Sequence, residues 1–367
     1  MASEAEKIVF DVLDRMQRNA RVRAVLAVSL LAALVGIGAY MLYDVLPRQH
    51  TITITGGDIL SNRHFLAKVL QEESAERGVS LRVNPSFGTH EALAMIDRGE
   101  LDMALIQGGL ETHYPHVTHV ATLLPELLHV IVRPDITDVA SLRGKMVNLG
   151  SRNGGTRVVA RQMLEFSGLT QVDYTESNLD MEELVSAHPE KLPDAAILIS
   201  SAPSEVAEFL VKERGYRVLE IPFPASLALR LGWVTDSKML AYTYSVKPPV
   251  PASDIRTIGV NLHLVANEDV DPRAVYKVLE TLFSPGLEVR LRTKMDEARL
   301  TVPSGYPLSE GTKKFLARKN PILSAENFDK VKSFLGLLLS AASALLIIFK
   351  WFKGSPEEVK APEKPAG

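Results

Sequence analysis

Three short segments of the sequence combine glycine with serine, threonine or asparagine immediately before a predicted helix. They are residues 56–62 (GGDILSN), 87–91 (FGTHE) and 150–156 (GSRNGGT). Glycine lets the backbone approach a ligand closely, and the first-turn N–H groups of a helix are unpaired donors at the positive end of its dipole. Such segments can bind an anion. Arg152 and Arg157 could add a bidentate countercharge for a carboxylate.

The same residue types also occur in ordinary turns and helix caps. What indicates a site is that three such segments follow strands that we expect to end at one cleft. Asp58 would repel an anion unless a cation came with it. The candidate ligand-binding residues are Gly57, Asp58, Ser61, Asn62, Gly88, Thr89, His90, Gln107, Ser151, Asn153, Gly154, Gly155, Thr156, Ser200 and Ser201. We predict no catalytic residue, metal ligand or cofactor.

Short β patterns alternate with helical patterns from residue 50 to about 325. Strict alternation in residues 51–55 (TITIT) predicts a strand, and an apolar stripe of Phe65, Leu66, Val69 and Leu70 predicts a helix that stops at Gly78. Further strands are expected at 79–83, 101–107, 127–132, 146–149, 195–199 and 257–265. Further helices are expected at 90–98, at 156–167, from about 203, near 272–283 and near 307–318.

Strands that alternate with helices are typical of α/β folds with mostly parallel sheets. The pattern restarts after Arg133 and Pro134 and returns through one long strand, which predicts two lobes with crossings near 131–136 and 255–262. We place lobe 1 at about 50–133 and 258–325, and lobe 2 at about 134–257. Ligands of such sheets bind beyond the carboxyl ends of the strands, here in the cleft between the lobes.

Two apolar segments flank this body, whose bounds we place at 48–328. Residues 24–43 carry no charge and would span about 30 Å as a helix, the thickness of a bilayer core. Basic residues within 1–23 place that segment in the cytoplasm. Residues 333–352 form a second predicted transmembrane helix, and 353–367 a disordered tail. We therefore expect the body on the periplasmic side of a bacterial inner (cytoplasmic) membrane, with both termini cytoplasmic.

Composition excludes several classes of function. The net charge is −3, so no broad basic field attracts nucleic acid. The chain has no cysteine, which excludes disulfides, thiolate metal sites and cysteine nucleophiles.

In order and spacing, residues 51 to about 320 resemble the TAXI family of solute receptors for TRAP transporters. The matching stretches include FGTHEALAMIDRGELDMALIQGG, SLRGKMVNLGSRNGGTRVVARQMLEFSGL, DAAILISSAPS and YPLSEGTKKF. The resemblance implies a type II periplasmic-binding-protein fold that closes on a small carboxylate such as glutamate or a related organic acid. Two membrane anchors would keep the receptor from diffusing, so we expect a membrane transporter, or another integral membrane protein, as partner.

Three alternatives remain open. His113, His116 and His119 could present three imidazoles to zinc from an extended segment. Glu100 and Asp102 could form a carboxylate pair of an enzyme, although the sequence contains no nucleophile elbow, metalloprotease helix or Walker loop. The chain could also be a membrane-tethered scaffold that keeps the binding-protein fold without a ligand.

Overall fold

The computed structural model describes residues 49–109, 113–291 and 293–319 without a break, together with scattered positions between 24 and 39 and between 332 and 346. The chain divides into two compact units, Arg48–Arg318 and the two terminal segments Met1–Pro47 and Lys319–Gly367. The scattered positions are helical. Part of the predicted span at 24–43, most of the span at 333–352, and all of 1–23 and 353–367 lie outside the described residues. Among the residues that are described, no helix is both long and apolar enough to cross a membrane.

The first lobe is built on parallel strands in the order β2–β1–β3. β1 (His50–Thr55) pairs with both β2 (Val79–Asn84) and β3 (Met103–Gln107). The helices of this lobe are α3 (Asn62–Ala75), α4 (Thr89–Asp97), α9 (Pro272–Leu282), α10 (Pro285–Leu291), the 3-10 helix η3 (Glu297–Arg299) and α11 (Glu310–Ala317).

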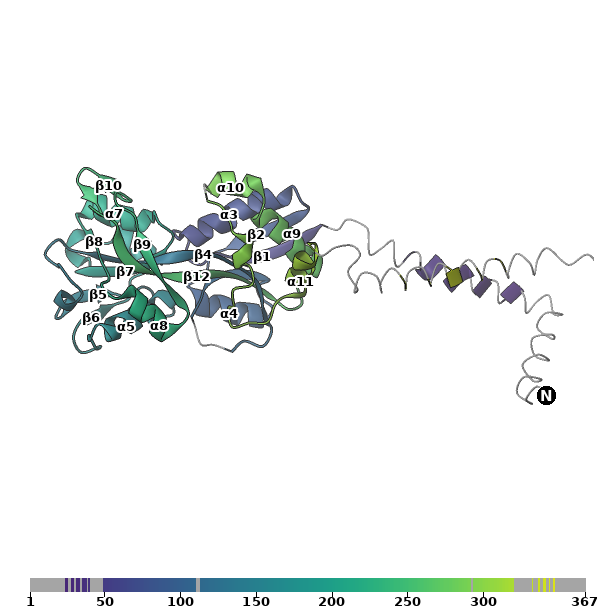
Figure 1. Cartoon of the computed structure of the whole chain (residues 1–367), viewed down its shortest axis with the longest axis horizontal. Coiled ribbons are helices and arrows are strands. Elements are labelled where there is room, and N and C mark those ends of the chain that lie inside the picture. The colour runs from purple at the N-terminus through teal and green to yellow at the C-terminus, as the bar shows by residue number, and fades with distance from the viewer. Residues whose placement is uncertain are drawn as a thin grey trace, which may run out of the picture. The chain divides into compact units, whose positions relative to one another are not determined.

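Alternate residues of β3 face opposite sides of the sheet, as the pleat of a strand requires. Met103 and Leu105 pack in the core formed with α3, α9, α10 and α11. Ala104 and Ile106 pack in a second, smaller core against α4. The helices therefore cover both faces of this lobe, with α4 on the side opposite α3 and α9 (Figure 1).

The second lobe repeats this arrangement around β5 (Met146–Asn148), which pairs in parallel with β6 (Thr175–Ser177) and β7 (Ala195–Ser200). Ile197 and Ile199 of β7 face the core with α5, and Leu198 faces the core with α7. The helices are η1 (Ala140–Leu142), α5 (Gly155–Phe166), α6 (Met181–Ser186), η2 (Pro189–Lys191), α7 (Glu205–Arg214) and α8 (Pro224–Leu231). The remaining strands are β8 (Arg217–Leu219), β9 (Val234–Met239), β10 (Ser245–Val246) and β11 (Pro249–Val250).

Two long antiparallel strands, β4 (Val117–Val132) and β12 (Ile255–Asn267), run through both lobes. In lobe 1, β12 pairs with β3; in lobe 2, residues 127–132 of β4 pair with β7, and residues 255–260 of β12 pair with β9. One ten-stranded sheet results. β4 therefore changes lobe near Pro125 and Leu127, several residues before the crossing expected at 131–136. A register shift in β12 lies between Asn261 and His263.

The alternation of strands and helices correctly indicated an α/β fold, but the sheet is mixed rather than mostly parallel, because β4, β8, β9 and β12 all pair antiparallel. The expected position of Phe65 was wrong. Its side chain is 57% exposed, whereas Leu66, Val69 and Leu70 on the same helix are buried. The core face of α3 is therefore narrower than the apolar pattern predicted.

Candidate ligand-binding cleft

A cleft lies where the carboxyl ends of the parallel strands of the two lobes face each other. Lobe 1 contributes the loop after β1, the loop after β2 and the last residue of β3. Lobe 2 contributes the loop after β5, the end of β7 and the start of α6. Leu179, Met181 and Leu184 form an apolar part of its wall. The cleft is therefore built from segments that are far apart in the sequence.

Two helices from opposite lobes begin in this cleft without a side-chain cap. α4 has Gly88 at its N-cap position and α5 has Gly154, whereas α3, α6 and α7 are capped by serine or aspartate side chains. A Cβ added to Gly88 would lie 3.2 Å from the Cα of Gly154, so the two helix starts meet across the cleft. Gly88 also has φ +124, ψ −177, a conformation open essentially only to glycine. The first-turn N–H groups and dipoles of both helices are thus directed at one place.

The Gln107 side chain adds an unused donor at the same place. Gln107 is 1% exposed, and its Oε1 accepts a long hydrogen bond of 3.5 Å from Arg63 Nη2. Its Nε2 has no hydrogen-bond partner within the described part of the chain. A Cβ added to Gly155 would lie 3.0 Å from that Nε2, so the amide rests against the start of α5. An unpaired buried donor is costly, and a ligand oxygen in the cleft would satisfy it.

A buried ion pair also lines the cleft. Arg63 Nε lies 2.9 and 2.8 Å from the two carboxylate oxygens of Glu126, and Nη2 lies 2.6 Å from Oε2. The two side chains are 13% and 2% exposed. Glu126 belongs to β4 at its passage between the lobes. Of the residues lining the cleft, all of which are described, Arg63 is the one with a cationic side chain, and Glu126 neutralises it.

Two further carboxylates lie in the lining. Asp58 accepts a hydrogen bond from Leu60 N at 2.8 Å, in the loop after β1. Asp180 caps α6 and forms a capping box with Glu183. The side chains of the lining therefore carry three negative charges against one positive charge, while the uncapped starts of α4 and α5 supply positive potential.

The structure brings most of the predicted site residues together. The cleft lining contains Gly57, Asp58, Ser61, Gly88, Thr89, Gln107, Ser151, Gly154, Gly155, Thr156 and Ser200. Thr89 is buried, and its Oγ1 accepts a hydrogen bond from Gln107 N at 3.2 Å. The hydroxyl therefore links α4 to the end of β3.

Four predicted residues lie outside this lining. Asn62 Nδ2 donates to the carbonyl oxygens of Ser201 at 3.0 Å and Pro203 at 3.1 Å, which ties α3 of lobe 1 to the loop before α7 of lobe 2. His90 and Asn153 instead line a separate rim pocket.

The countercharge expected from Arg152 and Arg157 was wrong. Both side chains line the rim pocket and not the cleft. Arg157 is paired with Glu176, with Nε 2.6 Å from Oε1. Arg161, one turn further along α5, binds the other oxygen of the same carboxylate, which also lowers the pKa of Glu176. The arginine side of α5 thus faces β6.

The three histidines do not converge on a metal site. His119 is buried in β4, where its Nε2 lies 2.8 Å from the Leu300 carbonyl oxygen and burial lowers its pKa. His116 is half-exposed, and its Nδ1 lies 2.7 Å from Glu268, whose hydrogen bond raises the pKa of the imidazole. His113 is exposed. Within the described ranges, no group of three histidine or carboxylate side chains could hold a metal ion.

Glu100 and Asp102 do not form a catalytic pair. Asp102 Oδ2 accepts hydrogen bonds from the backbone N and the Oγ1 of Thr53, at 2.6 and 2.7 Å. Glu100 is bound by the guanidinium of Arg98 on the surface. Each carboxylate therefore holds local structure rather than facing the cleft.

Sequence reasoning missed the ion pair of Arg63 and Glu126, and also Asp180. One signal for Glu126 was present, because it is the single charged residue in the apolar stretch 117–132. A charge in a buried strand needs a partner. No local pattern identified Arg63 as that partner.

Two lobes joined by two crossing strands, with a cleft at the carboxyl ends of their parallel strands, define a periplasmic-binding-protein-like domain of type II. The chain matches the model of the NMT1-like family over residues 55–317 and belongs to that family. The match does not show the finer assignment to TAXI receptors.

Solved structures of similar shape include the alkanesulfonate-binding protein SsuA from Xanthomonas axonopodis pv. citri bound to MOPS. That protein is 13% identical, with 81% of this chain and 94% of that chain covered and a TM-score of 0.40. Lipoprotein Tp32 from Treponema pallidum is 14% identical, with 67% and 95% covered and a TM-score of 0.39. A mutant OxyR2 regulatory domain from Vibrio vulnificus is 12% identical, with 66% and 98% covered and a TM-score of 0.43.

Proposed function

We propose that this chain is a receptor that binds a small organic anion, a carboxylate or an amino acid, in the cleft between its lobes. The observation that carries the proposal is the meeting of two uncapped helix starts from opposite lobes beside the unpaired Nε2 of buried Gln107. Hydrogen-bond donors from both lobes converge there on a space that a carboxylate could fill. Ser151, Thr156 and Ser200 add hydroxyl groups to the same lining.

Binding would act through closure of the lobes. A ligand held by the start of α4 on one lobe and the start of α5 on the other stabilises the closed arrangement by its differential affinity for that state. The hydrogen bonds of Asn62 to the other lobe add to the closed state. Closure changes the surface that a partner contacts.

The membrane assignment is part of the proposal. Residues 24–43 and 333–352 would anchor the receptor on the periplasmic side of a bacterial inner membrane, because both segments are apolar. The described positions within them are helical, and Val25, Val28 and Leu339 are each more than 60% exposed. A tethered receptor cannot diffuse, so it would serve uptake or sensing through a neighbouring integral membrane protein. The finer assignment to receptors of the TAXI type rests on the sequence motifs.

Thermal unfolding of the full-length protein against a panel of small carboxylates and amino acids tests the proposal. A ligand that binds only the folded state raises stability by about 2.7 kcal/mol at a hundred times its Kd. Thr156→Trp should abolish the shift, because it fills the cleft beside α5. Thr301→Trp, at an exposed position outside the cleft, is the matched control and should keep the shift. A flat response of the wild-type protein across the panel would favour the ligand-free scaffold.

A further inference from the structure

The cleft presents an unusual distribution of charge for an anion site. Arg63 is the cationic residue among those that line the cleft. Its Nε and Nη2 atoms lie 2.6–2.9 Å from the carboxylate oxygens of Glu126. Its remaining contact in the lining is the oxygen of the Gln107 amide at 3.5 Å. Glu126 therefore neutralises this guanidinium and occupies its Nε–Nη2 edge, so Arg63 offers a ligand carboxylate no uncompensated positive charge.

The donors that remain for a ligand are neutral. They are the uncapped starts of α4 and α5, the Nε2 of Gln107 and hydroxyl groups such as that of Ser200. These groups can hold one carboxylate. A second carboxylate on the same small molecule would lie in a cleft that already contains Asp58, Glu126 and Asp180, with no free cation in the described lining to receive it.

We propose that the cleft selects molecules with a single carboxylate over matched dicarboxylates, and that Glu126 determines this specificity by occupying the guanidinium of Arg63. The inference rests on the proposed function, since it names the charge of the ligand for the same cleft. Glu126 is suited to the role because β4 carries it between the lobes, where it is 2% exposed and fixed by the sheet. Glu126 thus pairs with the guanidinium that a second ligand carboxylate would need as its partner.

Two substitutions separate this role from a purely structural one. Glu126→Gln keeps the shape of the side chain and frees the charge of Arg63 for a ligand. The double variant Arg63→Gln/Glu126→Gln removes both charges and leaves the net charge of the lining as in the wild-type protein. A general disturbance of the cleft would affect both variants, whereas the freed guanidinium exists only in Glu126→Gln.

The experiment is a titration calorimetry series on the full-length protein near pH 7.5 with two matched pairs of probes. Butyrate and succinate differ by one carboxylate at equal carbon number, and glutamine and glutamate differ by one charge at equal length. The wild-type protein should bind the monocarboxylate of a pair at least about tenfold more tightly. Glu126→Gln should shift the ratio of the two Kd values toward the dicarboxylate by about ten- to a hundredfold, the worth of a charge-assisted hydrogen bond. The double variant should return the ratio toward that of the wild-type protein.

A preference of the wild-type protein for succinate or glutamate overturns the inference, as does a ratio that Glu126→Gln leaves within about threefold. In either case, binding that is lost in Thr156→Trp leaves the proposed function intact. If none of the four probes binds any of the proteins, the inference fails, and a flat response across the wider panel then refutes the proposed function as well. Circular dichroism of each variant verifies that the fold is retained.

Discussion

Replacing Asn62 with alanine should loosen the contact between the lobes by a predictable amount. The side-chain amide donates to two carbonyl oxygens of the other lobe, those of Ser201 and Pro203, at 3.0 and 3.1 Å. A neutral hydrogen bond contributes about 0.5–1.5 kcal/mol, and we take a low value for the solvent-exposed bond to Pro203. The two together contribute about 1–2 kcal/mol to the closed arrangement. The ratio of closed to open molecules should therefore fall about five- to thirtyfold.

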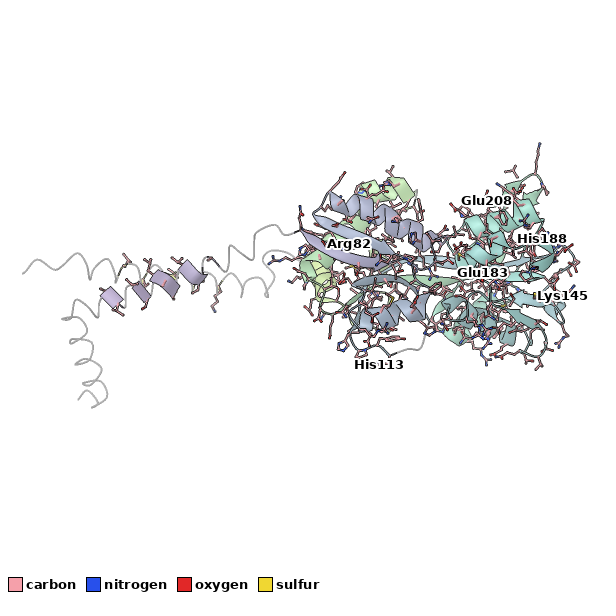
Figure 2. The ribbon with its side chains drawn as sticks, turned by 180° about the vertical axis from the view of Figure 1, so that it is seen from behind. Arg82, His113, Lys145, Glu183, His188 and Glu208 are labelled. Atoms are coloured by element: carbon pink, nitrogen blue, oxygen red, sulfur yellow. The ribbon has the colours of Figure 1, made fainter. Side chains whose placement is uncertain are left out.

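Single-molecule fluorescence transfer between the lobes measures this ratio. The chain has no cysteine, so two introduced cysteines carry the dyes without background labelling. Arg82 and His188 are exposed and lie on different lobes (Figure 2), which makes Arg82→Cys and His188→Cys suitable positions. Asn84→Ala is the matched control, because Asn84 is exposed at the end of β2. If Asn62→Ala and Asn84→Ala give the same transfer efficiencies, the hydrogen bonds of Asn62 do not hold the two lobes together.

Two further perturbations test the packing behind the cleft. Gly88→Ala forces a side chain into a conformation essentially restricted to glycine and should cost about 1–3 kcal/mol of unfolding free energy in urea titrations. Gly144→Ala, at φ +76 with no heavy atom within 4 Å of the added Cβ, should cost less. Equal losses would contradict the stricter requirement for glycine at Gly88, which combines its backbone conformation with the Cα of Gly154 3.2 Å from an added Cβ. Burial lowers the pKa of His129 to about 4 and of His263 to about 3, so the unfolded state binds more protons below pH 6.5. Each histidine should therefore lower the unfolding free energy by about 2 kcal/mol between pH 7 and pH 5. His129→Gln should remove about 2 kcal/mol of this pH dependence, measured by urea titrations at the two pH values, with the exposed His113→Gln as the matched control. A pH dependence unaffected by His129→Gln would argue against a neutral buried imidazole.

The parts of the cleft that could be predicted from the sequence are those encoded locally. A glycine next to serine or threonine between a strand and a helix marks a tight turn wherever it occurs, and the three segments 56–62, 87–91 and 150–156 all contribute to the lining. The same local logic predicted the strand at 51–55 and the helix that follows it. It failed for Phe65, because the apolar stripe shows which residues are apolar but not how wide a face the neighbouring elements cover.

The charge of the cleft could not be predicted in this way, because its decisive pair joins residues 63 positions apart. Arg63 is one of several polar residues at the start of α3, and only the passage of β4 between the lobes brings Glu126 to it.

The wrong prediction that Arg157 supplies a countercharge in the cleft has the same origin. The helical period shows that Arg157 and Arg161 share one side of α5, away from the buried Val159 and Met163. It does not show that β6 places Glu176 on that side, where its carboxylate pairs with both arginines. The anion contact that we propose at the start of α5 therefore depends on the backbone alone. An arginine near a glycine-rich loop therefore predicts an anion site only when no carboxylate from another part of the fold pairs with it. In this cleft, three carboxylates surround the single arginine of the described lining, which favours a ligand with one negative charge over a ligand with two.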